Sequence, residues 1–459
     1  MWTEVQGPEE KVIERTVALL TSAFRTLRRE VPAERIRSLG ELVCQAMSTG
    51  GRYFHTLEHV FDLANPSDPL QTLAALFHDV VYCQVDRGFT LPVAVILDPY
   101  VVRGDGSLVL TSRPRYHDLP WRLMLGLFGL QAGQRLMPES GQNEFLSALL
   151  MARVLSDLLT FQELVGVGTC IEATIPFRGP DANGETAPEA LARRVRQLNI
   201  RHGLGLSQAE VQRMIKRAVA FANQDVANFA EPDPGRFLDN TWKLLPETNP
   251  ALRLREAYSV VSYRRALQDM AAFLAQLDPR TIFHQYRDEP PPSQYAQLVA
   301  QATRNLQIGR EYLNLKLVAI ALLEALAMVS GGDGPISLLS GGLDEGGGLR
   351  LEGLLPPVEA AAGVDETSTL YKLLALGRAS ETDFDLRHSP LALFIFRALG
   401  PEGAWALLEP AYAMFAGDLS PSAFLAQVPA EVLAPVAAGC ARLAPTRRAS
   451  LQAYATRRS

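Results

Sequence analysis

Three of the seven histidines in the chain lie close together, and an aspartate directly follows the third. His55 and His59 are four residues apart, and His78 precedes Asp79. Two imidazoles at this spacing share one face of a helix, and an adjacent His-Asp pair brings a nitrogen and an oxygen ligand together. One His-x-x-x-His pair would be a weak indication, because such spacing arises by chance. The pair and the dipeptide together predict a metal site, and the alternative is a hydrogen-bonded cluster that packs helices.

Helices are expected to position these residues. Apolar spacing near 3.6 predicts helices over residues 9–29 and 34–48. The Ser-Thr-Gly-Gly break at 48–51 then makes the first two histidines open a new helix. Another helix is predicted after Pro69, with His78 and the aspartate that follows it near its C-terminal end.

Two later segments also predict helices. Periodicity resumes at 143 and holds to about 164, where glycines are expected to end the helix. Ser207 and Glu210 have the spacing of a capping box, and the helix that they open carries Asp225 on an apolar stripe. A carboxylate on a buried face has to be protonated, paired or bound to a cation.

The composition predicts a globular chain. Apolar residues make up 47% of the 459 positions and charged residues 20%, which excludes disordered and fibrous classes. This length favours two domains, or one large helical domain with an appendage. The net charge of -6 argues against a nucleic-acid polymer or an anionic membrane as partner, whereas a local basic pocket for a phosphate stays open.

A cytoplasmic location is expected. The four cysteines lack CxxC spacing and are interpreted as reduced, buried thiols, and the first ten residues lack the layout of a signal peptide. The apolar run 313–329 contains Lys316 and Glu324 and is shorter than a bilayer span needs, so it predicts a buried helix. Self-association stays open.

The predicted fold class is all-α, with no series of strands. A helical catalytic domain is expected over 1–330, with an insertion at about 86–140 that forms a lid or a surface embellishment. A Gly-rich connector follows at 331–349, because the stretch lacks the Lys-Ser/Thr of a phosphate-binding loop. The helical region 350–459 has no role that its sequence indicates.

Three segments carry further patterns in a fixed order: Phe-His-x-Leu-Glu-His at 54–59, Phe-His-Asp-x-x-Tyr at 77–82 and Asn-Glu-x-x-Ser-Ala at 143–148. In these segments the chain resembles small bacterial members of the HD superfamily of metal-dependent phosphohydrolases. It is more distantly similar to cyclic-nucleotide phosphodiesterases. The resemblance covers residues 10–260 and implies an HD-type helical bundle with a C-terminal helical extension.

The resemblance also implies residue roles. His59, His78 and Asp79 match the family's metal ligands, and His55 matches the histidine that protonates the leaving oxygen. The segment around Asp225 is similar to the one that supplies the family's distal ligand, and its apolar stripe supports the same choice.

Several assignments keep alternatives. Asp157 and Asp239 compete for the distal ligand position. Glu144 is a candidate proton acceptor or ligand-orienting group, or else a carboxylate that satisfies helix N-terminal amides. Glu58 is a candidate hydrogen-bond partner of a ligand histidine, and Arg52 a candidate phosphate contact; both are otherwise ordinary solvated or paired charges. The other histidines, at 117, 202, 284 and 388, are interpreted as ordinary residues.

The expected activity is hydrolysis of a phosphomonoester or phosphodiester in a small, nucleotide-like molecule, by attack of a metal-bound water. One or two divalent ions are expected, with Mn, Fe, Mg, Zn and Ni not distinguished. One alternative is a non-catalytic HD fold that senses a nucleotide or acts as a scaffold. Another is a di-iron HD-type oxygenase, which generally uses more histidines than this chain offers.

Overall fold

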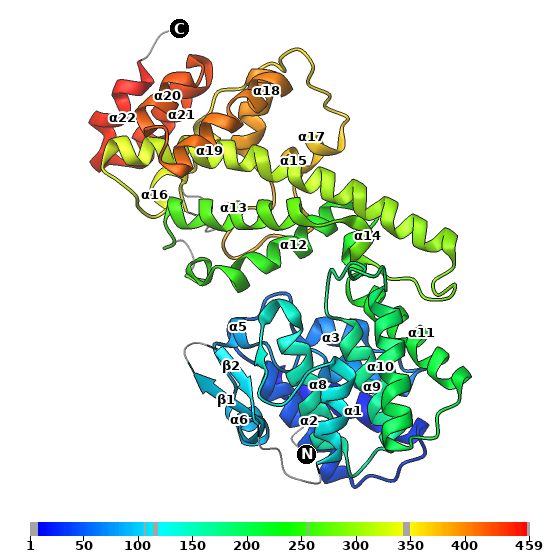
Figure 1. Cartoon of the computed structure of the whole chain (residues 1–459). Coiled ribbons are helices and arrows are strands. Elements are labelled where there is room, and N and C mark those ends of the chain that lie inside the picture. The colour runs from blue at the N-terminus through cyan, green and yellow to red at the C-terminus, as the bar shows by residue number, and fades with distance from the viewer. Residues whose placement is uncertain (1–7, 105–106, 113–117, 255–256, 343–348, 457–459) are drawn as a thin grey trace, which may run out of the picture. The chain divides into compact units, whose positions relative to one another are not determined.

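The computed structural model describes residues 8–104, 107–112, 118–254, 257–342 and 349–456, and Figure 1 traces the chain. It divides into two compact units. The first comprises Met1–Ala227 and Asp278–Ala300, and the second comprises Asn228–Leu277 and Gln301–Ser459. This division differs from the predicted one, which kept 1–330 together and began a separate region at 350. The first unit holds all the residues predicted to form the metal site.

The first unit is mainly helical. Its longer helices are α1 (Pro8–Thr26), α2 (Ala33–Met47), α4 (Pro69–Phe77), α7 (Leu119–Phe128), α8 (Gln142–Leu155), α9 (Phe161–Ala173), α10 (Ala187–His202) and α11 (Gln208–Asp225), and the short ones are α3 (Leu57–Leu63), α5 (Cys83–Asp86), α6 (Leu91–Leu97) and α14 (Pro279–Ile282). Helix α9 packs against α4, α8 and α11, so the elements that carry the predicted ligands surround one core. The predicted all-α class is confirmed.

The segment predicted as an insertion is more than a surface embellishment. Three short antiparallel strands lie in it, β1 (Val101–Gly104), β2 (Ser107–Leu110) and β3 (Arg135–Leu136), although no strand series was expected. Helix α7 packs on α8 and α9 and buries Trp121 completely. Parts of two predicted segments lie outside the described residues: 105–106 and 113–117 of this segment, which include His117, and 343–348 of the predicted connector.

One helix boundary was predicted wrongly. The helix expected to run from 143 to 164 ends at Leu155, and α9 begins after Thr160, whose capping box with Glu163 fixes the new start. The glycines expected to end the helix lie inside α9. At Gly168 a Cβ would come within 2.9 Å of the Leu127 side chain, so the missing side chain permits close packing on α7.

The second unit is also helical. Its elements are α12 (Pro234–Thr248), α13 (Val260–Gln276), most of α15 (Pro292–Ser330), α16 (Ser337–Ser340), α17 (Thr369–Ala375), α18 (Pro390–Ala406), α19 (Leu408–Ala416), α20 (Pro421–Gln427), α21 (Ala430–Leu443) and α22 (Arg448–Ala455). Helix α15 is long and apolar enough to cross a bilayer, but 78% of its most apolar window is buried in the protein. Helices α18 and α19, bent by 62° at their junction, pass the same test only if counted together. Such burial is typical of a core helix.

The four cysteines are free thiols, as predicted. Cys44, Cys170 and Cys440 are buried, whereas Cys83 is only half-buried, which corrects the expectation that all four are buried.

Candidate metal centre

The first two histidines of the motif do not share a helix. Thr56 is the N-cap of α3 and its hydroxyl accepts from the backbone N–H of His59, so His55 lies before the helix begins. The prediction that both rings lie on one helical face is therefore wrong. Their centroids are 6.5 Å apart, and the His55 ring packs edge-on against Tyr82, 4.6 Å between centroids.

His78 is positioned as a ligand would be. It caps the C-terminal end of α4, is 2% exposed, and its Nδ1 lies 2.9 Å from the Ala75 carbonyl oxygen. A proton on Nδ1 leaves the Nε2 lone pair free, which is how outer contacts orient metal-binding histidines. Nε2 lies 3.1 Å from Oδ2 of Asp79 and 3.5 Å from Oδ1 of Asp225 but forms no hydrogen bond of acceptable geometry. A buried, unsatisfied ring nitrogen facing two carboxylates fits a cation site.

Asp225, the predicted distal ligand, lies beside the histidines of the cluster. It is the last residue of α11, and its Oδ1 lies 3.0 Å from Nε2 of His59. One ligand atom each of His59, His78 and Asp79 lies within 4.8 Å of the others. These residues can hold one divalent ion with mixed nitrogen and oxygen ligands.

The two competing aspartates are used elsewhere. Asp157 is exposed and lies 3.5 Å from Arg35. Asp239 belongs to the second unit, where it accepts from the backbone and hydroxyl of Ser380.

The imidazole and carboxylate groups of this cluster shift one another's pKa values. Burial alone would lower the pKa of His78, but Asp79 and Asp225 outweigh it and hold that pKa well above its usual value. Burial would raise the pKa of Asp79, and the nearby charges of His78, His55 and His59 lower it instead. The two carboxylates therefore favour the imidazolium form of His78, in which Nε2 carries a proton that a bound metal ion would displace. A divalent cation offers these carboxylates the same compensation.

Arg52 has an internal partner. Its side chain is 1% exposed and forms a bidentate pair with Asp86, at 3.0 Å from Nε to Oδ1 and 2.6 Å from Nη2 to Oδ2. Nη1 also donates to the backbone oxygen of Asp79 at 2.6 Å. This geometry assigns Arg52 to bracing the His-Asp turn rather than to contacting a phosphate.

Glu58 also differs from its predicted place. Its carboxylate lies 3.0 Å from Nη1 of Arg15, and both side chains are more than half exposed. The prediction that it hydrogen-bonds a ligand histidine finds no support in this contact, because the second position of α3 directs it away from the buried face.

The third motif holds the turn that follows Asp79. The Asn143 side chain accepts from the backbone N–H of Cys83 at 3.1 Å, and the Ser147 hydroxyl accepts from that of Val81 at 3.1 Å. Since Val81 is 2% exposed, its amide has no access to bulk water and depends on this bond. The motif thus connects α8 to the turn that follows His78 and Asp79.

Glu144 lies in the first turn of α8 and is half-buried. Burial raises its pKa to about 7; the charges of Asp79 and Asp225 act in the same direction, and that of Arg178 opposes them. A carboxyl group with this pKa is suited to exchanging protons near neutral pH.

Sequence reasoning missed Asp86, the supporting contacts of Asn143 and Ser147, and Arg178. Arg178 forms two short contacts with the buried carboxylate of Glu172, at 2.7 and 3.2 Å. The acidic partner of a buried arginine has no sequence signal when the two are 34 residues apart, as Arg52 and Asp86 are.

Among the remaining histidines, His284 belongs to the segment that returns to the first unit. Its backbone exchanges two hydrogen bonds of 2.8 Å with the side chain of Asn223, two residues before Asp225. Burial lowers the pKa of His284 to about 4, and Arg178 adds to the effect. This segment therefore supports the end of α11, where Asp225 lies.

Comparisons with protein-family models, with curated proteins and with solved structures found no match.

Proposed function

We propose that the chain is a metal-dependent phosphohydrolase that acts on a phosphomonoester or phosphodiester of a small, nucleotide-like molecule. The observation that carries the proposal is the convergence of Asp79 and Asp225 on the unsatisfied Nε2 of His78, with His59 beside them. These four residues would hold the ion. When bound, a divalent ion neutralises phosphoryl oxygens and lowers the pKa of a coordinated water.

The protein's own groups supply the proton transfers. His55 precedes α3, and its ring centroid lies 6.5 Å from that of His59, so it lies beside the group of His59, His78 and Asp79. From there it serves as the acid that protonates the leaving oxygen. Glu144, with its raised pKa, is the second group able to exchange a proton near neutral pH.

Charge stabilisation of the substrate depends on the ion. Arg52 and Arg178 both use their guanidinium groups on internal partners, so neither offers a whole fork to a phosphate. This favours small substrates that the ion neutralises directly over long polyanions.

The test combines elemental analysis with turnover. The purified protein, as isolated and after addition of Mn²⁺ or Mg²⁺, is assayed on a nucleotide panel and on bis(p-nitrophenyl) phosphate. We expect near-stoichiometric metal and phosphoester cleavage. Asp79→Asn should abolish cleavage while the circular dichroism spectrum is kept, and the exposed-site control Asp157→Asn should retain it. A protein with no bound transition metal and no turnover under any of these conditions refutes the proposal.

A further inference from the structure

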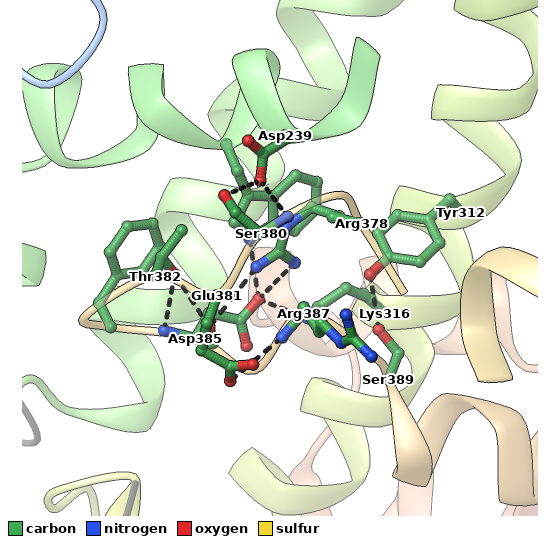
Figure 2. A network of polar contacts seen from close by, with 12 residues as sticks. Asp239, Tyr312, Lys316, Arg378, Ser380, Glu381, Thr382, Asp385, Arg387 and Ser389 are labelled. Carbon is green, nitrogen blue, oxygen red and sulfur yellow. Dashed lines mark hydrogen bonds and ion pairs between the residues drawn. The ribbon is translucent and has the colours of Figure 1, made fainter. Parts of the chain in front are cut away.

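The polar network of the second unit joins a loop to two helices. Asp385, on the loop between α17 and α18, accepts from Lys316 of α15 at 2.7 Å and from Arg378 at 3.1 Å (Figure 2). Ser380 of the same loop donates to Asp239 of α12 through its backbone amide and its hydroxyl (Figure 2). Because these groups pair with one another, we interpret the network as a structural brace.

Tyr82, the last residue of the second motif, has a different setting beside the candidate metal centre. Its half-buried ring packs edge-on against the ring of His55, with centroids 4.6 Å apart and an angle of 87° between the planes. Aromatic pairs prefer such edge-to-face geometry at centroid separations of about 4.5–7 Å. Tyr82 therefore contacts the residue that the proposed function uses as the acid.

The backbone of Tyr82 is fixed on both sides. The amide of Val81, which precedes it, donates to the Ser147 hydroxyl at 3.1 Å. The amide of Cys83, which follows it, donates to the Asn143 side chain at 3.1 Å. The carbonyl oxygen of Tyr82 itself accepts from two amides of α5, at 2.9 and 3.2 Å. The third motif thus helps to fix the position from which the Tyr82 ring extends.

A second ring contacts His55 from the first motif. His55 lies in the middle of a three-residue turn, because the amide of Thr56 donates to the carbonyl oxygen of Phe54 at 2.8 Å. The ring of Phe54 lies 5.0 Å from that of His55, at 75°, and 5.1 Å from that of His59. One ring of each motif therefore contacts the imidazole of the proposed acid.

We propose that Tyr82 is a positioning residue that, together with Phe54, orients His55 toward the leaving oxygen of an alkyl phosphoester such as a sugar phosphate. This inference rests on the proposed function. An alkoxide is strongly basic and departs slowly unless it receives a proton as its bond breaks, whereas a phosphate or a nitrophenolate departs without one. An oriented acid therefore serves a substrate whose leaving group is a sugar hydroxyl better than it serves a phosphoanhydride.

The proton transfer involves His55 and water. The oxygen of a water molecule bonds to phosphorus as the bond from phosphorus to the leaving oxygen breaks. The leaving oxygen keeps the electron pair of that bond and takes the proton of the His55 ring. The proton that the water loses returns to the ring through solvent, so the imidazole ends in its starting form. Tyr82 exchanges no proton in this step, so its ring is what the step requires.

The dependence of the rate on the leaving group tests the inference. The full-length protein with Mn²⁺ is assayed on the nucleoside monophosphate or cyclic nucleotide that the wild type cleaves fastest, and on bis(p-nitrophenyl) phosphate. Tyr82→Leu should lower kcat for the nucleotide about 10–100-fold with little change in KM, and should leave kcat for the nitrophenyl ester within about two-fold. Tyr82→Phe keeps the ring and should recover most of the loss.

Two further variants complete the comparison. Phe54→Leu removes the second ring and should show the same dependence on the leaving group, so a poorly folded Tyr82→Leu does not leave the inference undecided. Tyr295→Leu is the matched control, because it removes a half-buried tyrosine ring of the first unit that lies on α15 and contacts Arg280. It should leave both rates unchanged.

The mobility of the His55 ring gives a readout that does not depend on turnover. NMR relaxation of the metal-free protein, labelled with ¹³C in its histidine rings, measures the order parameter of the Cε1–H bond. His55→Gln identifies the resonance. The order parameter should fall in Tyr82→Leu and stay unchanged in Tyr82→Phe and Tyr295→Leu. Metal affinity of Tyr82→Leu, measured by competition with a chelator, should remain that of the wild type.

The inference is overturned if the His55 ring is as ordered in Tyr82→Leu as in the wild type, if cleavage of both substrates slows equally, or if this variant loses its metal. A wild type that cleaves bis(p-nitrophenyl) phosphate but no nucleotide also overturns it, because no acid is then assisting the leaving group. A wild type that cleaves neither substrate refutes the proposed function itself, and the inference falls with it.

Discussion

Removing the guanidinium of Arg52 should destabilise the first unit strongly. Arg52 and Asp86 have side chains that are 1% and 4% exposed, and they form a bidentate pair beside the turn that carries Asp79. Arg52→Met keeps the apolar stem but leaves the carboxylate of Asp86 buried without its cation, a change that costs about 3–5 kcal/mol. The hydroxyl of Thr49 still donates to Asp86, so we expect the lower end, about 3 kcal/mol.

Hydrogen exchange, followed by mass spectrometry, suits this measurement because two compact units need not unfold together. Peptides covering 69–86 report the opening free energy of the ligand-bearing region. The matched control is Arg15→Met, which breaks the exposed pair with Glu58 and should cost less than about 1 kcal/mol. Metal affinity should also fall by about 10–100-fold in Arg52→Met, because the backbone oxygen of Asp79 loses a donor.

A double variant separates the pair from other effects of the substitution. Arg52→Met with Asp86→Leu removes both charges, and an apolar replacement of a buried pair is often neutral or stabilising. We therefore expect it to recover most of the lost free energy. The reasoning is refuted if the single variant stays within about 1 kcal/mol of the wild type, or if the double variant is as unstable as the single one.

Three other variants examine the site from different directions. Asp225→Asn should lower metal affinity at least about ten-fold, measured by competition with a chelator, whereas Asp157→Asn should not. Burial raises the pKa of Glu144 from 4.5 to about 7, so the folded metal-free protein holds a proton that the unfolded chain releases between these pH values, and stability falls as the pH rises through this window. The free energy of unfolding of Glu144→Gln lacks this loss, so its difference from the wild type should shift in favour of the variant between pH 5 and pH 8. Denaturation in the presence of a chelator measures both values. Equal differences at the two pH values would contradict the raised pKa. Ser147→Ala should lower the opening free energy by about 1–3 kcal/mol, because the buried amide of Val81 loses its hydrogen-bond acceptor.

The sequence determined the local features of this protein. Apolar periodicity located α1, α2 and α4, the capping box of Ser207 located the start of α11, and the place of Pro69 at the start of α4 was correct. The all-α class followed from these helices. These properties depend on residues within one or two helical turns of each other, so the sequence alone predicts them. The helix end at Leu155 was missed because Gly166 and Gly168 were expected to end this helix. Both lie inside α9, where a glycine permits close packing instead of terminating the helix.

The tertiary structure decided which polar residues meet. Asp225 lies 166 residues from His59 in the sequence, and the packing of α11 in the first unit brings the two side chains together. Asp157 and Asp239 contact Arg35 and Ser380 instead. The partner of Arg52 is also set by tertiary contacts. Its charge predicted a phosphate contact, but its guanidinium pairs with the buried carboxylate of Asp86. Residue type and spacing define what chemistry a side chain can perform, but its partners are set by contacts between distant segments, which a single sequence does not encode locally.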